Sequence, residues 1–107
     1  MFTEDAVFIR PSTPNLPIQG RAAILEAFRS RPERVSCHFV CNTIVTLISQ
    51  TKASATSNIL LVSGSPDIAP ATALPPHMVG SFKDKLELQN GVWLFTERVG
   101  SLQLRLM

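Results

Sequence analysis

The sequence has no tyrosine, one tryptophan and few charged residues, which make up 17% of its 107 positions. So little charge is unusual for a lone monomer and predicts that a partner covers part of the apolar surface. The formal net charge is only +2, and the ten lysines and arginines are scattered from Arg10 to Arg105. A nucleic-acid partner is therefore not expected.

Long apolar runs are missing as well. No stretch of about 18 apolar residues is present to span a bilayer, and the sequence opens with Glu4 and Asp5 instead of a basic segment followed by an apolar one. These features predict a cytoplasmic protein with no membrane partner. The length predicts a single domain over residues 1–107, large enough to bury one core without a metal or disulfide.

Cysteine is limited to Cys37 and Cys41 in one β-prone segment. Along an extended strand their Cα atoms would lie about 13 Å apart, beyond the roughly 7 Å that a disulfide allows. A metal site would need two more ligands, and His38 points to the opposite face of the same strand. We predict two buried, reduced thiols, and we expect neither a metal nor a cofactor.

The first third of the sequence predicts one short strand and one helix. Residues 6–9 are β-prone, after the end of a turn or helix at 3–5 and before a proline-rich loop at 11–17. Gly20 is a candidate N-cap for a helix over 21–31, because Ile24, Leu25 and Phe28 fall on one face and Pro32 ends the run.

The rest of the sequence predicts four long strands, at 36–49, 53–62, 78–88 and 92–106. The first is too long for a flat strand and is expected to bend or bulge. Asn90-Gly91 is a strong two-residue hairpin signal, and four prolines in 66–76 indicate a surface loop. Pairing of successive strands predicts an α+β fold in which one short and four long antiparallel strands pack on the short helix.

Four segments carry a resemblance to a known family: FTEDAVF at 2–8, GRAAI at 20–24, CHFVCN at 37–42 and NGVWLF at 90–95. In this order and spacing they resemble the SnoaL-like polyketide-cyclase and scytalone-dehydratase branch of the nuclear-transport-factor-2-like superfamily. The resemblance implies a cystatin-like, cone-shaped, strongly curved sheet around a pocket for a hydrophobic small molecule, and a homodimer formed through the outer sheet face. Members usually begin with a long helix, and this sequence starts where that helix would end.

His38 is the main candidate for chemistry. The resemblance places it in the cavity, where it would transfer a proton to or from substrate, and an imidazole with an ordinary pKa near 6.5 suits acid or base catalysis at neutral pH. Strict alternation puts His38, Val40, Asn42 and Ile44 on one face, so Asn42 is a candidate hydrogen-bond donor beside it. A core or interface histidine bonded to the backbone is the alternative.

Other candidates are weaker. Four apolar residues are predicted pocket walls, with plain core positions as the alternative: Phe8, Phe28, Val40 and Phe82. Asp84 and Glu97 are two acids within the last hairpin, and either would have a raised pKa if it turned inward; Glu97 is assigned to the pocket, and the surface is the alternative. Asp5 is close in sequence to where related enzymes keep pocket carboxylates, but it also fits an ordinary turn.

Two departures from the family pattern concern the polar network of the pocket. Ser63 stands where dehydratase-like members have a second histidine, and tyrosine is absent. Two hypotheses therefore remain open. The protein is either a cofactor-independent dehydratase, isomerase or cyclase-like enzyme that transfers a proton on a cyclic or aromatic molecule, or a non-catalytic ligand-binding or dimeric assembly module.

Overall fold

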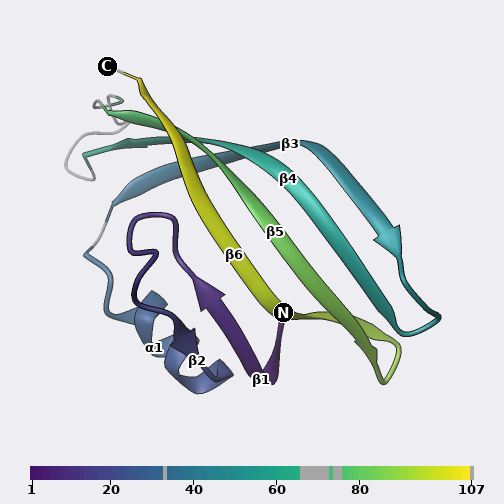
Figure 1. Cartoon of the computed structure of the whole chain (residues 1–107). Coiled ribbons are helices and arrows are strands. Elements are labelled where there is room, and N and C mark those ends of the chain that lie inside the picture. The colour runs from purple at the N-terminus through teal and green to yellow at the C-terminus, as the bar shows by residue number, and fades with distance from the viewer. Residues whose placement is uncertain (33, 66–72, 74–75, 107) are drawn as a thin grey trace.

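A computed structural model of the chain describes residues 1–32, 34–65, 73 and 76–106. In these residues six strands form one sheet in the order β2-β1-β6-β5-β4-β3, with a single helix beside it (Figure 1). The elements in chain order are β1 (Phe2–Ile9), β2 (Ile18–Gln19), α1 (Arg21–Arg29), β3 (Val35–Leu47), β4 (Lys52–Gly64), β5 (His77–Gln89) and β6 (Val92–Leu106). This is the expected α+β architecture.

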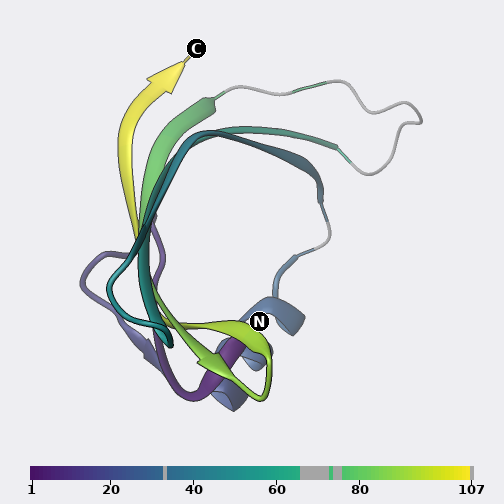
Figure 2. The same ribbon diagram turned by 90° about the vertical axis from the view of Figure 1, so that its right-hand side faces the viewer.

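The sheet is strongly curved, and its concave face is turned toward the helix (Figure 2). Its register shifts between Cys41 and Ile44 on β3, and twice along the β5–β6 pair, at Val79/Gly80 and at Lys85/Leu86. An extra residue on one strand bends that strand and increases its twist. The long strands therefore curl around the concave face instead of forming a flat sheet.

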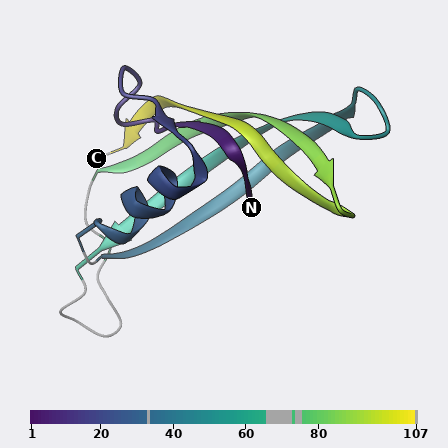
Figure 3. The same cartoon turned by 90° about the horizontal axis from the view of Figure 1, so that it is seen from below.

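The helix α1 covers the narrow part of the concave face (Figure 3). Its Ile24 is almost fully buried and packs in the core with Phe2, Ala6 and Phe8 of β1. The helix ends at Arg29, two residues before the predicted end. The reason is local: the residue before Pro32 avoids helical geometry, and the Ser30 N–H and hydroxyl both donate to the Glu26 carbonyl, at 3.0 and 2.9 Å.

The first strand differs from expectation in two ways. It begins at Phe2, so residues 3–5 belong to a strand and not to a turn, and it pairs with β6 in parallel. The two-residue β2 pairs with it on the other side and brings the strands of the described residues to six. The prediction of an all-antiparallel sheet is therefore wrong. It assumed that each strand pairs with the next strand along the chain, whereas β1 and β6 come from opposite ends of the sequence.

The predicted bulge of β3 is confirmed. Cys41 pairs with Asn58 but Ile44 pairs with Thr56, so β3 carries one extra residue, and Asn42 has a positive φ of 53°. An extra residue reverses the faces of all residues beyond it. Ile44 therefore lies on the face opposite to His38, contrary to the strict alternation assumed from the sequence.

The strand β3 is an edge of the sheet, and all of its residues are exposed. Cys37 and Cys41 are free but not buried, contrary to prediction, because no described element covers their face. The predicted loop at 66–76 lies mostly outside the described residues, although Ala73 forms a bridge with Gly64. In the described part of the chain, the helix is too short and too polar to cross a membrane.

Candidate functional site

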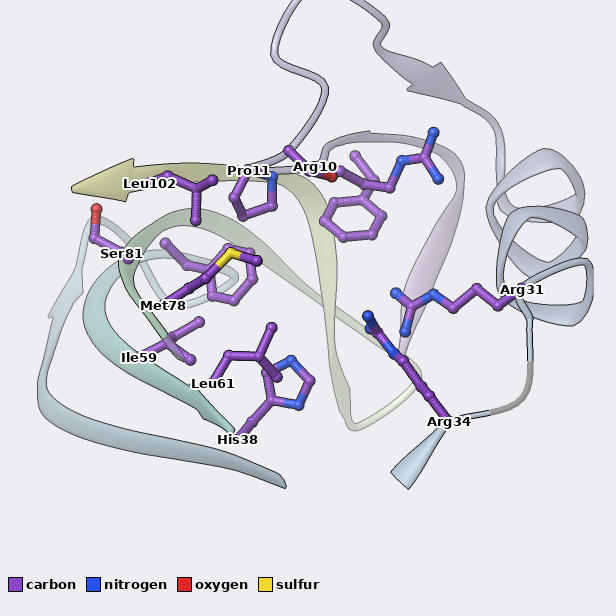
Figure 4. Close-up of a pocket in the computed structure, with 14 residues that line it drawn as sticks. Arg10, Pro11, Arg31, Arg34, His38, Ile59, Leu61, Met78, Ser81 and Leu102 are labelled. Carbon is purple, nitrogen blue, oxygen red and sulfur yellow. The ribbon is translucent and has the colours of Figure 1, made fainter. Parts of the chain in front are cut away.

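A cavity of about 160 Å³ opens on the concave face, between the sheet and the segment that follows α1 (Figure 4). Its apolar lining comes from β1 and the loop after it and from β4, β5 and β6: Phe8, Pro11, Ile59, Leu61, Met78, Phe82 and Leu102. Its other lining residues are Arg10, Ser12, Arg31, Arg34, His38, Gly80 and Ser81. The cavity therefore combines an apolar floor with a rim of basic side chains.

The floor follows from strand alternation along β4 and β5. Ile59 pairs with Gly80 and Leu61 with Met78, so alternate residues of both strands point to the concave face. Gly80 is required for its size, because a Cβ at this position would lie 2.5 Å from the carbonyl oxygen of Ser101.

His38 enters the cavity from β3, directly opposite Leu61 and before the bulge (Figure 4). Partial burial lowers the pKa of its imidazole below the ordinary value, and the positive charges of Arg34, Arg31 and Arg98 lower it further. None of the described lining residues is a carboxylate that could orient the ring. His38 is therefore held in its neutral form at neutral pH, the form that accepts a proton.

Three arginines share the rim, although they come from three separate segments. Arg10 follows β1, Arg31 follows α1 and Arg34 precedes β3. Burial lowers the pKa of Arg31, and so do the neighbouring charges of Arg34 and Arg10. Sequence reasoning missed all three, although the spacing Arg29, Arg31, Arg34 next to the predicted helix end was a visible signal.

Phe28 contacts two lining residues of the cavity, Phe8 and Arg31, without lining the cavity itself. Its ring stacks on Phe8 with centroids 5.8 Å apart, and the Arg31 guanidinium lies 4.6 Å from its centroid. Cation–π contacts of this kind fix the direction of an arginine side chain. Phe28 is 42% exposed and is not on the cavity surface, so it acts through Phe8 and Arg31 instead of forming the predicted wall.

A buried ion pair lies next to the cavity wall. Arg98 Nε is 3.4 Å from Asp84 Oδ1, and the two side chains are 18% and 6% exposed. The guanidinium also lies over Phe82 and Phe95, at 3.8 and 4.7 Å from their ring centroids. Burial raises the pKa of Asp84 against the opposing effect of Arg98, and burial likewise lowers the pKa of Arg98 against the effect of Asp84.

A model of the SnoaL-like domain family matches residues 1–99 of the sequence. The chain belongs to the SnoaL-like family. A comparison with curated proteins gives no match.

Solved structures show the same fold. A hexachlorocyclohexane dehydrochlorinase of LinA type 3 from Novosphingobium barchaimii LL02 has a TM-score of 0.77 at 15% identity, over 98% of this chain and 70% of that one. For a candidate scytalone dehydratase from Novosphingobium aromaticivorans the TM-score is 0.73 at 24% identity, over 97% and 67%. A cystatin-like protein from Caulobacter vibrioides gives 0.70 at 15% identity, over 97% and 72%.

In this SnoaL-like domain, Glu97 does not line the cavity as predicted. It pairs with Lys85 on the outer face of the sheet, where their side chains form an exposed ion pair of 3.3 Å. Asp84 is the acid that turns inward. The signal was present in the sequence, because Asp84 alternates in phase with Phe82 and Leu86.

The SnoaL-like cavity brings together three of the predicted site residues, namely Phe8, His38 and Phe82. Val40 shares the face of His38 but is 56% exposed and lies beyond the cavity. Asn42 is in the exposed bulge, and Asp5 lines a separate polar hollow with Glu87. In the described residues no cluster of three or more His, Cys, Asp or Glu side chains is placed to hold a metal.

Proposed function

We propose that this SnoaL-like domain binds a hydrophobic cyclic or aromatic molecule in the concave cavity and transfers a proton on it without a cofactor. The observation that carries the proposal is the position of His38, a neutral imidazole on the wall of an apolar cavity. The names of two structural relatives, a dehydrochlorinase and a candidate dehydratase, denote eliminations and support a lyase or isomerase.

The proposed chemistry uses His38 as the base. Its free ring nitrogen accepts a proton from a carbon of the ligand, and the electron pair of the broken C–H bond remains on the ligand as an enolate or carbanion. The positive charges of Arg31 and Arg34 favour this anion. The imidazolium then returns the proton to a second position in an isomerisation, or to a leaving group in an elimination.

A solvent-exchange assay tests this proposal without knowledge of the natural substrate. The protein is incubated in D2O with a panel of cyclic ketones and phenols, and loss of ligand C–H signals is followed by proton NMR. We expect exchange of at least one ligand to be about 100-fold slower in His38→Ala than in the wild type, since general base catalysis contributes at least this much. His77→Gln is the matched control, because His77 begins β5 and is not on the cavity surface.

Equal exchange in His38→Ala and the wild type would refute the role of His38 as a base. Absence of any ligand-induced chemical shift change around His38 would refute the binding site as well. The two readouts are independent, because the first follows the ligand and the second follows the protein.

A non-catalytic ligand-binding module is the second candidate. It is favoured by the lack of a described carboxylate on the cavity lining that could orient His38. This version predicts that ligands shift resonances around the cavity in the wild type and in His38→Ala alike, with no exchange in either.

We also propose that the domain dimerises through the outer face of the sheet. Phe39 and Ile44 are 54% and 65% exposed, and both lie on the outer face of β3. Sedimentation should detect a dimer at micromolar concentration that Phe39→Ser with Ile44→Ser dissociates; a monomeric wild type would contradict it. The two exposed free thiols suit a reducing compartment, and we propose the cytoplasm.

A further inference from the structure

The rim of the cavity carries an unusual concentration of positive charge. In Figure 4 the side chains of Arg31 and Arg34 extend from the end of α1 and from the start of β3, and their guanidinium groups lie near one another. Arg10 joins them on the cavity lining. The Nε atom of Arg10 is buried and has no hydrogen-bond partner.

No described residue of the lining neutralises this charge. The two acids of the last hairpin that were candidates for the pocket already form ion pairs with other residues: Asp84 pairs with Arg98, and Glu97 pairs with Lys85. Burial lowers the pKa of Arg31, and the neighbouring arginines lower it further, because like charges held together at a partly buried site repel one another. Such a cluster is stabilised when an anion binds between its members.

The geometry points to an amphiphilic anion as the ligand of this cavity: a single aromatic or alicyclic ring that carries a carboxylate bound by Arg31 and Arg34. This inference rests on the proposed function for the location of the ligand and names its chemical class. The planar fork of a guanidinium matches a carboxylate through two parallel hydrogen bonds.

The apolar floor decides against a bare inorganic anion. Phe82, Leu61 and Met78 offer no hydrogen bonds to a phosphate or sulfate, but they suit the faces of a ring. A dry apolar cavity of about 150 Å³ holds a molecule of the size of benzene, and the volume here is about 160 Å³. A single ring therefore fills the floor and leaves its carboxylate at the arginine rim.

The arrangement also places a reacting atom near His38. The imidazole lies between the floor and the rim, opposite Leu61 and near Arg34. In an alicyclic acid, the C–H bond on the carbon that bears the carboxylate would face this base, and the arginines would favour the dianionic enolate that forms when this proton moves to His38. The rim would thus bind the ligand and also lower the energy of its deprotonated form.

Matched pairs of an acid and its neutral amide test the inference. Benzoate against benzamide, and cinnamate against cinnamamide, differ in charge but hardly in shape. Titrations followed by protein NMR at low salt should give at least about 10-fold tighter binding of each acid, because hydrogen bonds to charged groups exceed neutral ones by about this factor. The preference should weaken as salt is added.

The variant Arg31→Gln with Arg34→Gln should lose the preference and retain the weak binding of the amides. Arg29→Gln with Lys52→Gln removes the same charge outside the cavity and should keep the preference. Circular dichroism checks that both double variants fold.

Four results would overturn the inference: equal affinity for acid and amide, a preference that survives in Arg31→Gln with Arg34→Gln, inorganic phosphate bound as tightly as the acids, or no binding of any acid. Equal binding of acid and amide next to His38 would leave the proposed function in place. Failure of every probe to bind would count against both.

Discussion

The ion pair of Asp84 and Arg98 gives the sharpest test of how the concave face is stabilised. Replacing Asp84 by Asn keeps the size of the side chain and removes its charge. Arg98 would then remain charged at a site where its side chain is only 18% exposed. Breaking one half of a buried pair is costly because the other half keeps its desolvation penalty.

The expected loss of stability in Asp84→Asn follows from the distance between the two charges and from the burial of both side chains. Two unit charges 3.4 Å apart attract by about 5 kcal/mol at an effective dielectric constant of about 20, and desolvation offsets much of this. Loss of one partner in such pairs costs about 3–5 kcal/mol. The Arg98 guanidinium keeps its contacts with Phe82 and Phe95, so we expect Asp84→Asn to lower the free energy of unfolding by about 2–3 kcal/mol.

Arg98→Met should cost slightly more at neutral pH, about 3–4 kcal/mol, because Asp84 is the more deeply buried partner. The destabilisation of Arg98→Met should be smaller at acidic pH. Burial already raises the pKa of Asp84 in the folded protein, and without Arg98 it rises further, so the stability of this variant should increase as the pH falls through the raised pKa. The double variant should be less destabilised than the sum of the two.

Urea unfolding at fixed protein concentration measures these differences, and Lys85→Gln is the matched control. It breaks the exposed pair with Glu97 on the same two strands, and a change of at most about 0.5 kcal/mol is expected. An Asp84→Asn variant within about 0.5 kcal/mol of the wild type would refute the reasoning, because Arg98 would then not depend on its partner.

Four further predictions concern the cavity and the bulge. Arg34→Gln should raise the pKa of His38 but leave it below the ordinary value, since burial is the larger cause of the shift. An NMR titration measures this pKa, and the variant His77→Gln identifies the signals of the other histidine. An unchanged pKa of His38 would show that solvent screens the charge of Arg34. Activity should rise with pH through this same pKa, as a base requires. Asn42→Val should cost about 1–2 kcal/mol at its φ of 53°, whereas Asn42→Gly should be nearly neutral in the same unfolding assay. Gly80→Ala should destabilise the fold and distort the cavity, because its Cβ would meet the Ser101 carbonyl oxygen; unchanged unfolding and ligand binding would contradict the packing.

Local patterns predicted most of the fold. The four long strands lie within two residues of their predicted bounds, because alternation and the Asn90-Gly91 turn are local signals. The parallel pairing of β1 with β6 is not local, since it joins the two ends of the sequence. Only the tertiary structure decides such a pair.

The candidate site could be predicted in part for the same reason. His38 and Phe82 lie on regular stretches of strand, so counting along the sequence places them correctly on the concave face. The arginine rim is assembled from Arg10, Arg31 and Arg34, and the first of these is far from the other two in the sequence. Their convergence requires the turn of the chain from β1 through α1 to β3.

The error over Glu97 has a physical cause in the register of the last hairpin. Leu86 pairs with Phe95, and without interruption the next inward pair would be Asp84 with Glu97, two carboxylates on one buried face. The extra residue Thr96 prevents this, and its hydroxyl donates to the Lys85 carbonyl at 3.2 Å. The shift brings Arg98 opposite Asp84 and Glu97 opposite Lys85, so that one bulge replaces a repulsive pair by two ion pairs. The charges of these four residues therefore favour the bulged register over the regular one, and this register places Arg98 on the inner face opposite Asp84.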